Sequence, residues 1–99
     1  MICWVIYDIK DDKARNRVNR HCKNAGLYPV QYSTFLGTLE PTQKDTLELQ
    51  IAPLIDDATD KVYIFPMSRD ELDQTVTMGI ALDKKLIAGE VAALFFRRE

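Results

Sequence analysis

The chain opens with a run of residues that fixes the centre of any fold it can adopt. Residues 2–7 are six consecutive apolar or aromatic side chains, and the run stops at Asp8. It is β-branched and aromatic, shorter than the roughly 10 residues of a buried helix, and apolar at both odd and even positions. These properties predict a strand buried on both faces, inside a sheet. A carboxylate at its end either caps a turn or helix, or is a functional group held on a rigid element.

A helix is expected directly after this strand. Asp11 or Asp12 suits the N-cap, because a carboxylate accepts hydrogen bonds from first-turn N–H groups and complements the positive end of the helix dipole. The helix starts near Lys13 and ends before Gly26, which supplies the left-handed residue that commonly follows a helix C-terminus. Its apolar stripe consists of Ala14, Val18, Cys22 and Ala25.

The remaining pattern completes a known order of elements. Residues 27–39 are rich in β-branched and aromatic side chains and predict one or two short strands. Pro41 suits the first turn of a second helix, and Pro53 interrupts that helix. Residues 61–67 predict another strand that is apolar on both faces. The order βαββαβ predicts an α+β, ferredoxin-like fold.

We expect one ferredoxin-like domain at residues 1–82 and a C-terminal tail at residues 83–99. Residues 75–80 predict a short extra strand at the end of the domain. The tail is apolar but interrupted by Gly89 and Glu90. We therefore expect it to become ordered only by docking on a dimer or another partner.

Charge is distributed unevenly along the chain. The net charge of −2 and the pI near 5.4 exclude a protein that coats nucleic acid with its whole surface. Residues 10–44 nevertheless contain seven Lys or Arg against three acids, whereas residues 45–99 contain six against eleven. The pattern predicts a basic surface close to Asp8.

Nothing in the sequence indicates a membrane span or a secretion signal. No apolar run approaches about 18 residues, and no basic segment precedes an apolar one in the manner of a signal peptide. Cys3 and Cys22 lack metal-binding spacing, which indicates buried, reduced thiols. We expect a cytoplasmic protein with no membrane partner.

The expected fold leaves one face of the sheet without helices. Residues 2–7 and 61–67 are apolar on both faces, so an uncovered face would expose an apolar patch that monomers seldom tolerate. A two-fold, face-to-face homodimer would bury it. The alternative is that residues 83–99 fold back over the sheet.

In a face-to-face dimer, Asp8 of one protomer has a symmetry-related counterpart in Asp8 of the other. Two carboxylates converging near the axis repel each other, and a divalent cation, Mg²⁺ (or Mn²⁺), relieves that repulsion. The arginine-bearing helix starts beside Asp8 and is placed to hold phosphates. The arrangement predicts metal-assisted phosphodiester hydrolysis, with Asp8 as both the catalytic and the metal-binding residue.

Several segments carry a resemblance to a known family. A strand ends in Tyr7-Asp8-Ile9, a helix contains Arg15-Asn16-Arg17, and a third segment reads Val-Gln-x-Ser-x-Phe-x-Gly at residues 30–37. In this order, over about residues 2–80, they resemble the Cas-two (Cas2) family of CRISPR spacer-acquisition proteins. The segment after about residue 82 matches no pattern of the family.

The resemblance implies a ferredoxin-like homodimer whose last strand, at about residues 75–80, pairs with the partner's sheet. It implies a role in capturing foreign DNA together with the integrase Cas-one (Cas1). It also implies Mg²⁺- or Mn²⁺-dependent cleavage of single-stranded RNA or duplex DNA. Pro29 stands where some relatives carry a basic residue, which removes one phosphate contact.

The family's site residues fall on specific positions of this chain. The resemblance places the catalytic aspartate at Asp8, and the residues that contact nucleic acid at Tyr7, Arg15, Arg17 and Phe35. Ser33 is a further candidate, either to orient Asp8 or to bind phosphate. Tyr7 and Phe35 have a competing interpretation as core or interface aromatics, and the two arginines as solvated helix surface.

Three other functions stay open on the sequence. The first is a non-catalytic DNA-binding scaffold for the integrase, in which Asp8 only shapes the dimer. The second is a toxin-type ribonuclease of the same fold. The third is a small-ligand regulatory domain, which lacks support because the chain has no Gly-rich effector loop.

Overall fold

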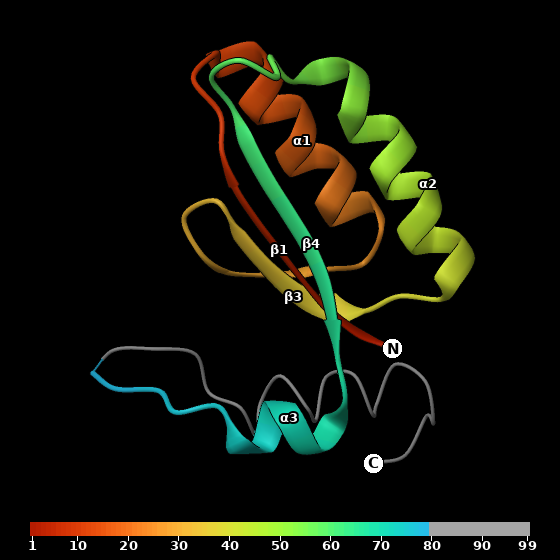
Figure 1. Ribbon diagram of the computed structural model, residues 1–99, viewed down its shortest axis with the longest axis vertical. Helices are drawn as coiled ribbons and strands as arrows, with labels where there is room; N and C mark the ends of the chain where they lie inside the picture. The colour runs from red at the N-terminus through yellow and green to blue at the C-terminus, as the bar shows by residue number, and fades with distance from the viewer. Residues whose placement is uncertain (80–99) are drawn as a thin grey trace.

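The computed structural model describes residues 1–79, which form a four-stranded sheet with helices on one face and a third helix beyond its end (Figure 1). The strands are β1 (Ile2–Asp8), β2 (Tyr28–Gln31), β3 (Thr34–Thr38) and β4 (Lys61–Met67). The helices are α1 (Asp12–Asn24), α2 (Pro41–Ile51) and α3 (Arg69–Gln74), and a short 3₁₀ turn, η1 (Ala52–Leu54), extends α2. The order through β4 is the predicted βαββαβ.

The sheet has the strand order β2-β3-β1-β4, and every pairing among these strands is antiparallel. β1 is central. It pairs with β3 on one side and with the whole of β4 on the other, where Ile2 lies opposite Met67 and Asp8 opposite Lys61. This order, with α1 and α2 on the same face, confirms the ferredoxin-like α+β fold. β4 is an edge strand of the sheet in the described chain.

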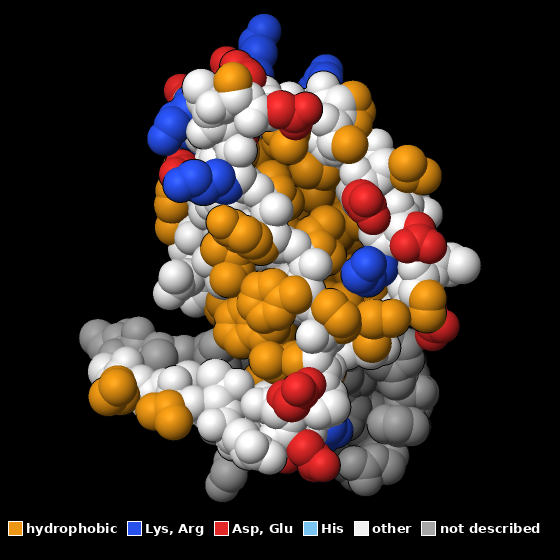
Figure 2. Space-filling view, viewed as in Figure 1, with side chains coloured by type: hydrophobic (Ala, Val, Ile, Leu, Met, Phe, Trp, Pro, Cys, Tyr) orange, Lys and Arg blue, Asp and Glu red, His pale blue; other side chains and the backbone are white. Residues whose placement is uncertain are grey.

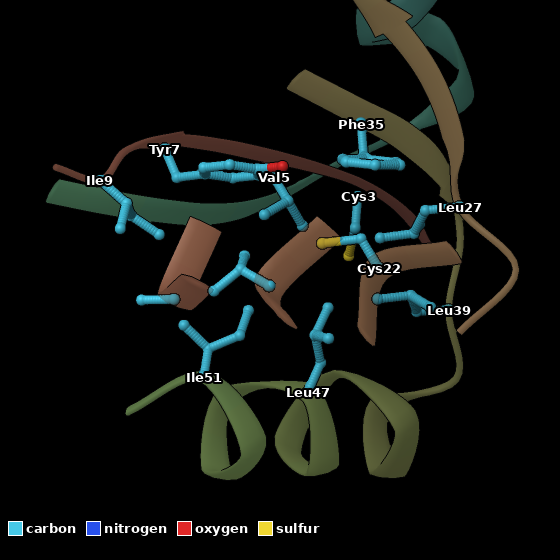
Figure 3. Packing of buried hydrophobic residues seen from close by; sticks show 12 residues of the cluster. Cys3, Val5, Tyr7, Ile9, Cys22, Leu27, Phe35, Leu39, Leu47 and Ile51 are labelled. Carbon is cyan, nitrogen blue, oxygen red and sulfur yellow. The ribbon is translucent and has the colours of Figure 1, made fainter. Parts of the chain in front are cut away.

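The main core lies between the sheet and the two long helices (Figure 3). Alternate residues of β1 point into it, and Leu47 and Ile51 reach toward them from α2. The apolar stripe predicted for α1 is buried at Ala14, Val18 and Cys22. Each large apolar side chain buried here contributes about 1.5–3 kcal/mol relative to exposure. Ala25, the fourth residue of the predicted stripe, is the C-cap and packs half-buried against the same core, so the stripe was predicted correctly.

The ends of the two long helices follow the signals in the sequence. Asp11 is the N-cap of α1, and its carboxylate accepts a hydrogen bond from the Ala14 N–H at 2.9 Å. Gly26 follows the helix with φ +89°, a left-handed conformation that glycine adopts without strain. α2 ends at Ile51, because Pro53 cannot continue the hydrogen-bond ladder.

Both cysteines are free thiols within the core, as predicted. Burial raises the pKa of Cys22 to about 12 and raises the pKa of Cys3 as well. The two thiols are therefore protonated at neutral pH and act as small apolar side chains.

The opposite face of the sheet, here called the open face, is apolar and only partly covered. β1 contributes Trp4 and Ile6, and β4 contributes Tyr63 and Phe65, which are 58% and 39% exposed. The rings of Trp4 and Phe65 stack with centroids 6.3 Å apart. Figure 2 shows apolar side chains gathered along β4. The prediction that β1 is buried on both faces thus holds on the helix side, while Trp4 and Ile6 stay half-buried on the other.

The segment after β4 differs from the prediction. The sequence predicts a strand at residues 75–80, but residues 75–79 form no strand in the described chain. They lie instead across the open face, where they border a cavity with Trp4 and Ile6 of β1 and Val30 of β2. The predicted tail at residues 83–99 lies outside the described residues.

The short helix α3 was not predicted, although the sequence contains its signal. Ser68 Oγ accepts from the Glu71 N–H at 3.0 Å, and Glu71 Oε1 accepts from the Ser68 N–H at 2.7 Å. This reciprocal pair is a capping box with the pattern Ser-x-x-Glu. The helix also buries Leu72 against Ile2 and Leu36 on the open face. Among residues 1–79, no helix has the length and apolar character needed to cross a membrane.

Candidate nucleic-acid interface and metal-binding carboxylate

Asp8 lies at the end of β1 on the open face. Side chains alternate along a strand, so Asp8 shares its face with Trp4 and Ile6. Its side chain is 62% exposed, and Lys10 Nζ lies 3.7 Å from its Oδ2. Because Asp11 caps α1, Asp8 is not needed as a helix cap. The carboxylate is therefore accessible and is held by the central strand of the sheet.

The exposed Asp8 carboxylate fits a magnesium-type site, and a second protomer would add a second carboxylate. Residues 1–79 contain no group of three or more His, Cys, Asp or Glu side chains that could hold a metal ion. One protomer therefore lacks the four-ligand set of a structural zinc site. Mg²⁺ is commonly held by one or two carboxylates together with water and phosphate oxygens, and Mn²⁺ accepts the same ligands. Asp8 from each of two protomers would supply that set.

A pocket of about 290 Å³ lies between α1 and the turn that joins β2 to β3. We call it the α1 pocket. It brings together four of the five predicted nucleic-acid contacts, while Asp8 points to the other face of β1. The residues that line it are Tyr7, Arg15, Asn16, Asn19, Lys23, Pro29, Gln31, Tyr32, Ser33 and Phe35.

Arg15 is anchored at the edge of this pocket. Its Nη1 donates to the carbonyl oxygen of Ile9 at 3.0 Å, and its Nη2 pairs with the Asp12 carboxylate. The hydrogen bond with Asp12 raises the pKa of Arg15, so the guanidinium stays charged. A guanidinium carries five N–H donors, and these two contacts leave others for a phosphate.

Tyr7 and Phe35 lie in the core below the pocket. They are 5% and 1% exposed, and their rings stack with centroids 6.4 Å apart. Burial raises the pKa of Tyr7, and a hydrogen bond with Asn19 opposes that rise. This burial favours the interpretation of both rings as core residues, although both also line the pocket.

Ser33 occupies the turn between β2 and β3 with φ +58°, a conformation that costs a non-glycine residue about 1–2 kcal/mol. Its carbonyl oxygen accepts from the Tyr7 N–H at 3.1 Å, which ties the turn to β1. Ser33 therefore borders the α1 pocket rather than Asp8. Arg17 is exposed on α1 and is not among the residues that line the pocket.

Four polar residues of the α1 pocket and one aromatic were not predicted. Asn16, Asn19 and Lys23 recur at spacings of three and four, which places them on one face of α1 next to Arg15. Helical spacing could have revealed this face. Gln31 is the last residue of β2 and Tyr32 belongs to the hairpin turn, and only the folded hairpin brings them against the helix.

The Asp60 carboxylate holds the loop that follows Asp8 through hydrogen bonds with backbone N–H groups. Its Oδ2 accepts from the Asp56 N–H at 2.8 Å and its Oδ1 from the Lys10 N–H at 3.0 Å. These hydrogen bonds, from Asp56 first and Lys10 second, lower the pKa of Asp60. The stabilisation is therefore fully present above the unfolded pKa of about 3.9 and is lost as the pH falls through the lower folded value.

Asp60→Asn should lower the melting temperature at pH 7 by a few degrees, because an amide has one acceptor oxygen and loses one of the two loop contacts. The difference from wild type should narrow below the unfolded pKa of about 3.9, where protonation of the carboxylate in the unfolded state begins to remove the wild-type stabilisation. Thermal melts followed by circular dichroism give the melting temperatures of the variant and the wild type at each pH. Asp57→Asn, an exposed acid of the same turn, is the control. An equal difference in melting temperature at both pH values would show that the Asp60 carboxylate does not stabilise the loop as described.

Comparison with known proteins identifies the family. Residues 1–75 match the family described as CRISPR associated protein Cas2. A protein of Archaeoglobus fulgidus named CRISPR-associated endoribonuclease Cas2 1 is 37% identical over 68% of this chain and 71% of its own length. One of Desulforudis audaxviator, named CRISPR-associated endoribonuclease Cas2, is 31% identical over 92% of this chain and 86% of its own length.

Two solved structures share the fold. A hypothetical protein from Thermus thermophilus superimposes with a TM-score of 0.70 at 27% identity, over 82% of this chain and 93% of that one. Streptococcus pyogenes Cas2 superimposes with a TM-score of 0.64 at 22% identity, over 80% of this chain and all of that one. The extent of the sequence match, together with the fold, shows that this chain belongs to the CRISPR associated protein Cas2 family.

Proposed function

We propose that the protein is a homodimeric CRISPR adaptation subunit that binds nucleic acid and cleaves phosphodiester bonds with Asp8 of each protomer and Mg²⁺ (or Mn²⁺). Its partners in this role are duplex DNA or single-stranded RNA and the integrase Cas1. The names of the relatives, CRISPR-associated endoribonucleases, support nuclease chemistry. The resemblance of residues 2–80 supports the adaptation role and the integrase.

The position of Asp8 carries the proposal. Its exposed carboxylate ends the central strand on the same face as the exposed Tyr63 and Phe65 rings. Burying those rings in a face-to-face dimer places both Asp8 side chains on the buried side of the two sheets. Such a pair would offer oxygen ligands to a divalent cation.

Each group has a defined task in the proposed reaction. The two Asp8 carboxylates would hold the cation, and Arg15, with Arg17 and Lys23 on the same helix, would hold phosphates on either side of the scissile bond. The Lys10 ammonium at 3.7 Å would neutralise part of the Asp8 charge in the absence of substrate. When bound, the cation supplies an activated water and neutralises charge that develops on the phosphoryl oxygens.

The scaffold is the second candidate, and one observation favours it. Each protomer offers a single carboxylate, and that carboxylate already has a cationic neighbour in Lys10. In a protein that only binds DNA, the pair of Asp8 and Lys10 would stabilise the end of the strand, and basic residues of α1 would supply all of the affinity. Cleavage distinguishes the two candidates, because both predict binding.

Cleavage should depend on added divalent metal. We expect the wild-type protein to cut single-stranded RNA or duplex DNA in Mg²⁺ or Mn²⁺, and to lose at least 90% of that activity, roughly a tenfold fall or more, in excess EDTA. Binding of the same oligonucleotide, measured by fluorescence anisotropy in EDTA, should persist. Tight binding without cleavage in either metal would favour the scaffold instead.

A further inference from the structure

We propose that the α1 pocket receives one unpaired nucleobase of a single-stranded nucleic acid, stacked on Tyr32. The inference rests on the proposed function, since it assumes that the protein binds nucleic acid. It assigns the stacking role to a residue that neither the sequence pattern nor the resemblance indicates. It also predicts that the protein distinguishes single-stranded from duplex ligands, whereas the proposed function does not choose between the two.

The aromatic rings first considered for stacking are not available. Phe35 is 1% exposed and Tyr7 5% exposed, and each already stacks on the other. A base cannot reach either face without displacing the core. Tyr32, in contrast, is 79% exposed and borders the same pocket. Exposed aromatic rings beside a basic surface are the common stacking platforms for unpaired bases.

Tyr32 is held on a fixed turn. The neighbouring Ser33 carbonyl accepts from the Tyr7 N–H at 3.1 Å, and Thr34 Oγ1 donates to the Tyr32 carbonyl oxygen at 3.4 Å. The turn joins two paired strands, with Gln31 opposite Thr34. The backbone of Tyr32 is therefore anchored at the pocket, which lowers the entropy that its ring loses when a base stacks on it.

The polar lining suits the edge of a base. Asn16, Asn19 and Gln31 line the pocket, and each amide offers both donors and an acceptor. Nucleobases present the same mixture along their edges. The volume of about 290 Å³ lies at the lower limit of small-ligand pockets, roughly 300–1,000 Å³, which fits one base with its sugar rather than several nucleotides.

The charge of the pocket suits the phosphate that follows the base. Arg15 and Lys23 are basic, and no acidic residue is among the described residues that line the pocket. Bases inside a duplex are paired and stacked, so they cannot enter a side pocket without unpairing at a cost of a few kcal/mol. The pocket is therefore suited to single strands, and duplex DNA would contact only the basic surface around it.

The test compares two ligands on matched variants. Fluorescence anisotropy in EDTA gives the dissociation constants for a short single-stranded RNA and for a blunt DNA duplex. Tyr32→Ala should raise the constant for the single strand about tenfold, since stacking contributes about 1–3 kcal/mol per base, and change that for the duplex by less than about twofold. Tyr32→Phe, which keeps the ring, and Leu49→Ala, an exposed residue of α2, should bind as wild type.

The outcomes separate the pocket from the proposed function. If wild type binds the single strand but Tyr32→Ala binds it equally well, or loses both ligands equally, the pocket assignment is wrong and the proposed function stands. If wild type binds neither ligand, the proposed function itself fails. A single-stranded oligonucleotide carrying 2-aminopurine gives a second readout, because stacking on Tyr32 should quench its fluorescence and Tyr32→Ala should restore it.

Discussion

Tyr63→Glu should convert the protein from a dimer to a monomer. Light scattering on the wild type should give about twice the 11.4 kDa mass of one chain, and the variant should give the mass of one chain. Tyr63 is 58% exposed on the open face, so the substitution is tolerated in a monomer. In a face-to-face dimer it would bury two unpaired carboxylates, at several kcal/mol each, which raises the dimer dissociation constant by roughly 100-fold or more.

Leu49→Glu is the matched control for this substitution. Leu49 is 74% exposed, but it belongs to α2 and is on the helix side of the sheet. The same change there should leave the dimer intact, and circular dichroism should show that both variants fold. A wild-type protein of monomeric mass, or a Tyr63→Glu variant that remains dimeric, would show that something other than a second copy covers the open face.

The fold up to β4 could be predicted because each element carries its own local signals. The apolar run of residues 2–7 fixed a central strand, Asp11 and Gly26 bounded α1, and Pro53 ended α2. Pattern and propensity agree throughout this region, which is the condition under which sequence reasoning succeeds.

Beyond β4 the local signals conflict. Residues 75–80 have the composition of a strand, yet a strand also requires the backbone hydrogen bonds of a sheet, and residues 75–79 belong to no strand of the described sheet. Pairing of this segment with a partner's sheet stays a prediction. The capping box at Ser68 and Glu71 was a readable signal for α3 that the strand-like composition obscured.

The candidate site was predictable in part. The family pattern indicated Asp8 and Arg15, and the structure places an exposed carboxylate and an anchored guanidinium there. The strand context of Phe35 offered a core position as one interpretation but could not decide it, because that burial depends on the packing of α1 against the sheet. No pattern indicated the position of Tyr32 beside Asn19, which depends on the hairpin turn. Both are tertiary contacts between segments that are distant in sequence.

Asp8→Asn should reduce cleavage by about 100-fold or more while leaving the fold and the dimer intact. The amide keeps the shape of the side chain but removes the charge that would hold the cation in the proposed reaction, and cation stabilisation of a transition state is worth several kcal/mol. Asp8 is exposed and its ion pair with Lys10 is a surface contact, so its loss should change stability by less than about 1 kcal/mol. Asp57→Asn, which also removes one exposed carboxylate, should retain full activity.

The most direct test of the Asp8 pair is the activity of a mixed dimer, purified through two different affinity tags, with one wild-type and one Asp8→Asn protomer. If both carboxylates hold one catalytic centre, the mixed dimer should be as inactive as the Asp8→Asn homodimer, although it binds nucleic acid as wild type does. If it retains about half of the wild-type rate, each Asp8 acts alone. That result, or undiminished cleavage by the Asp8→Asn homodimer, would contradict a shared metal centre.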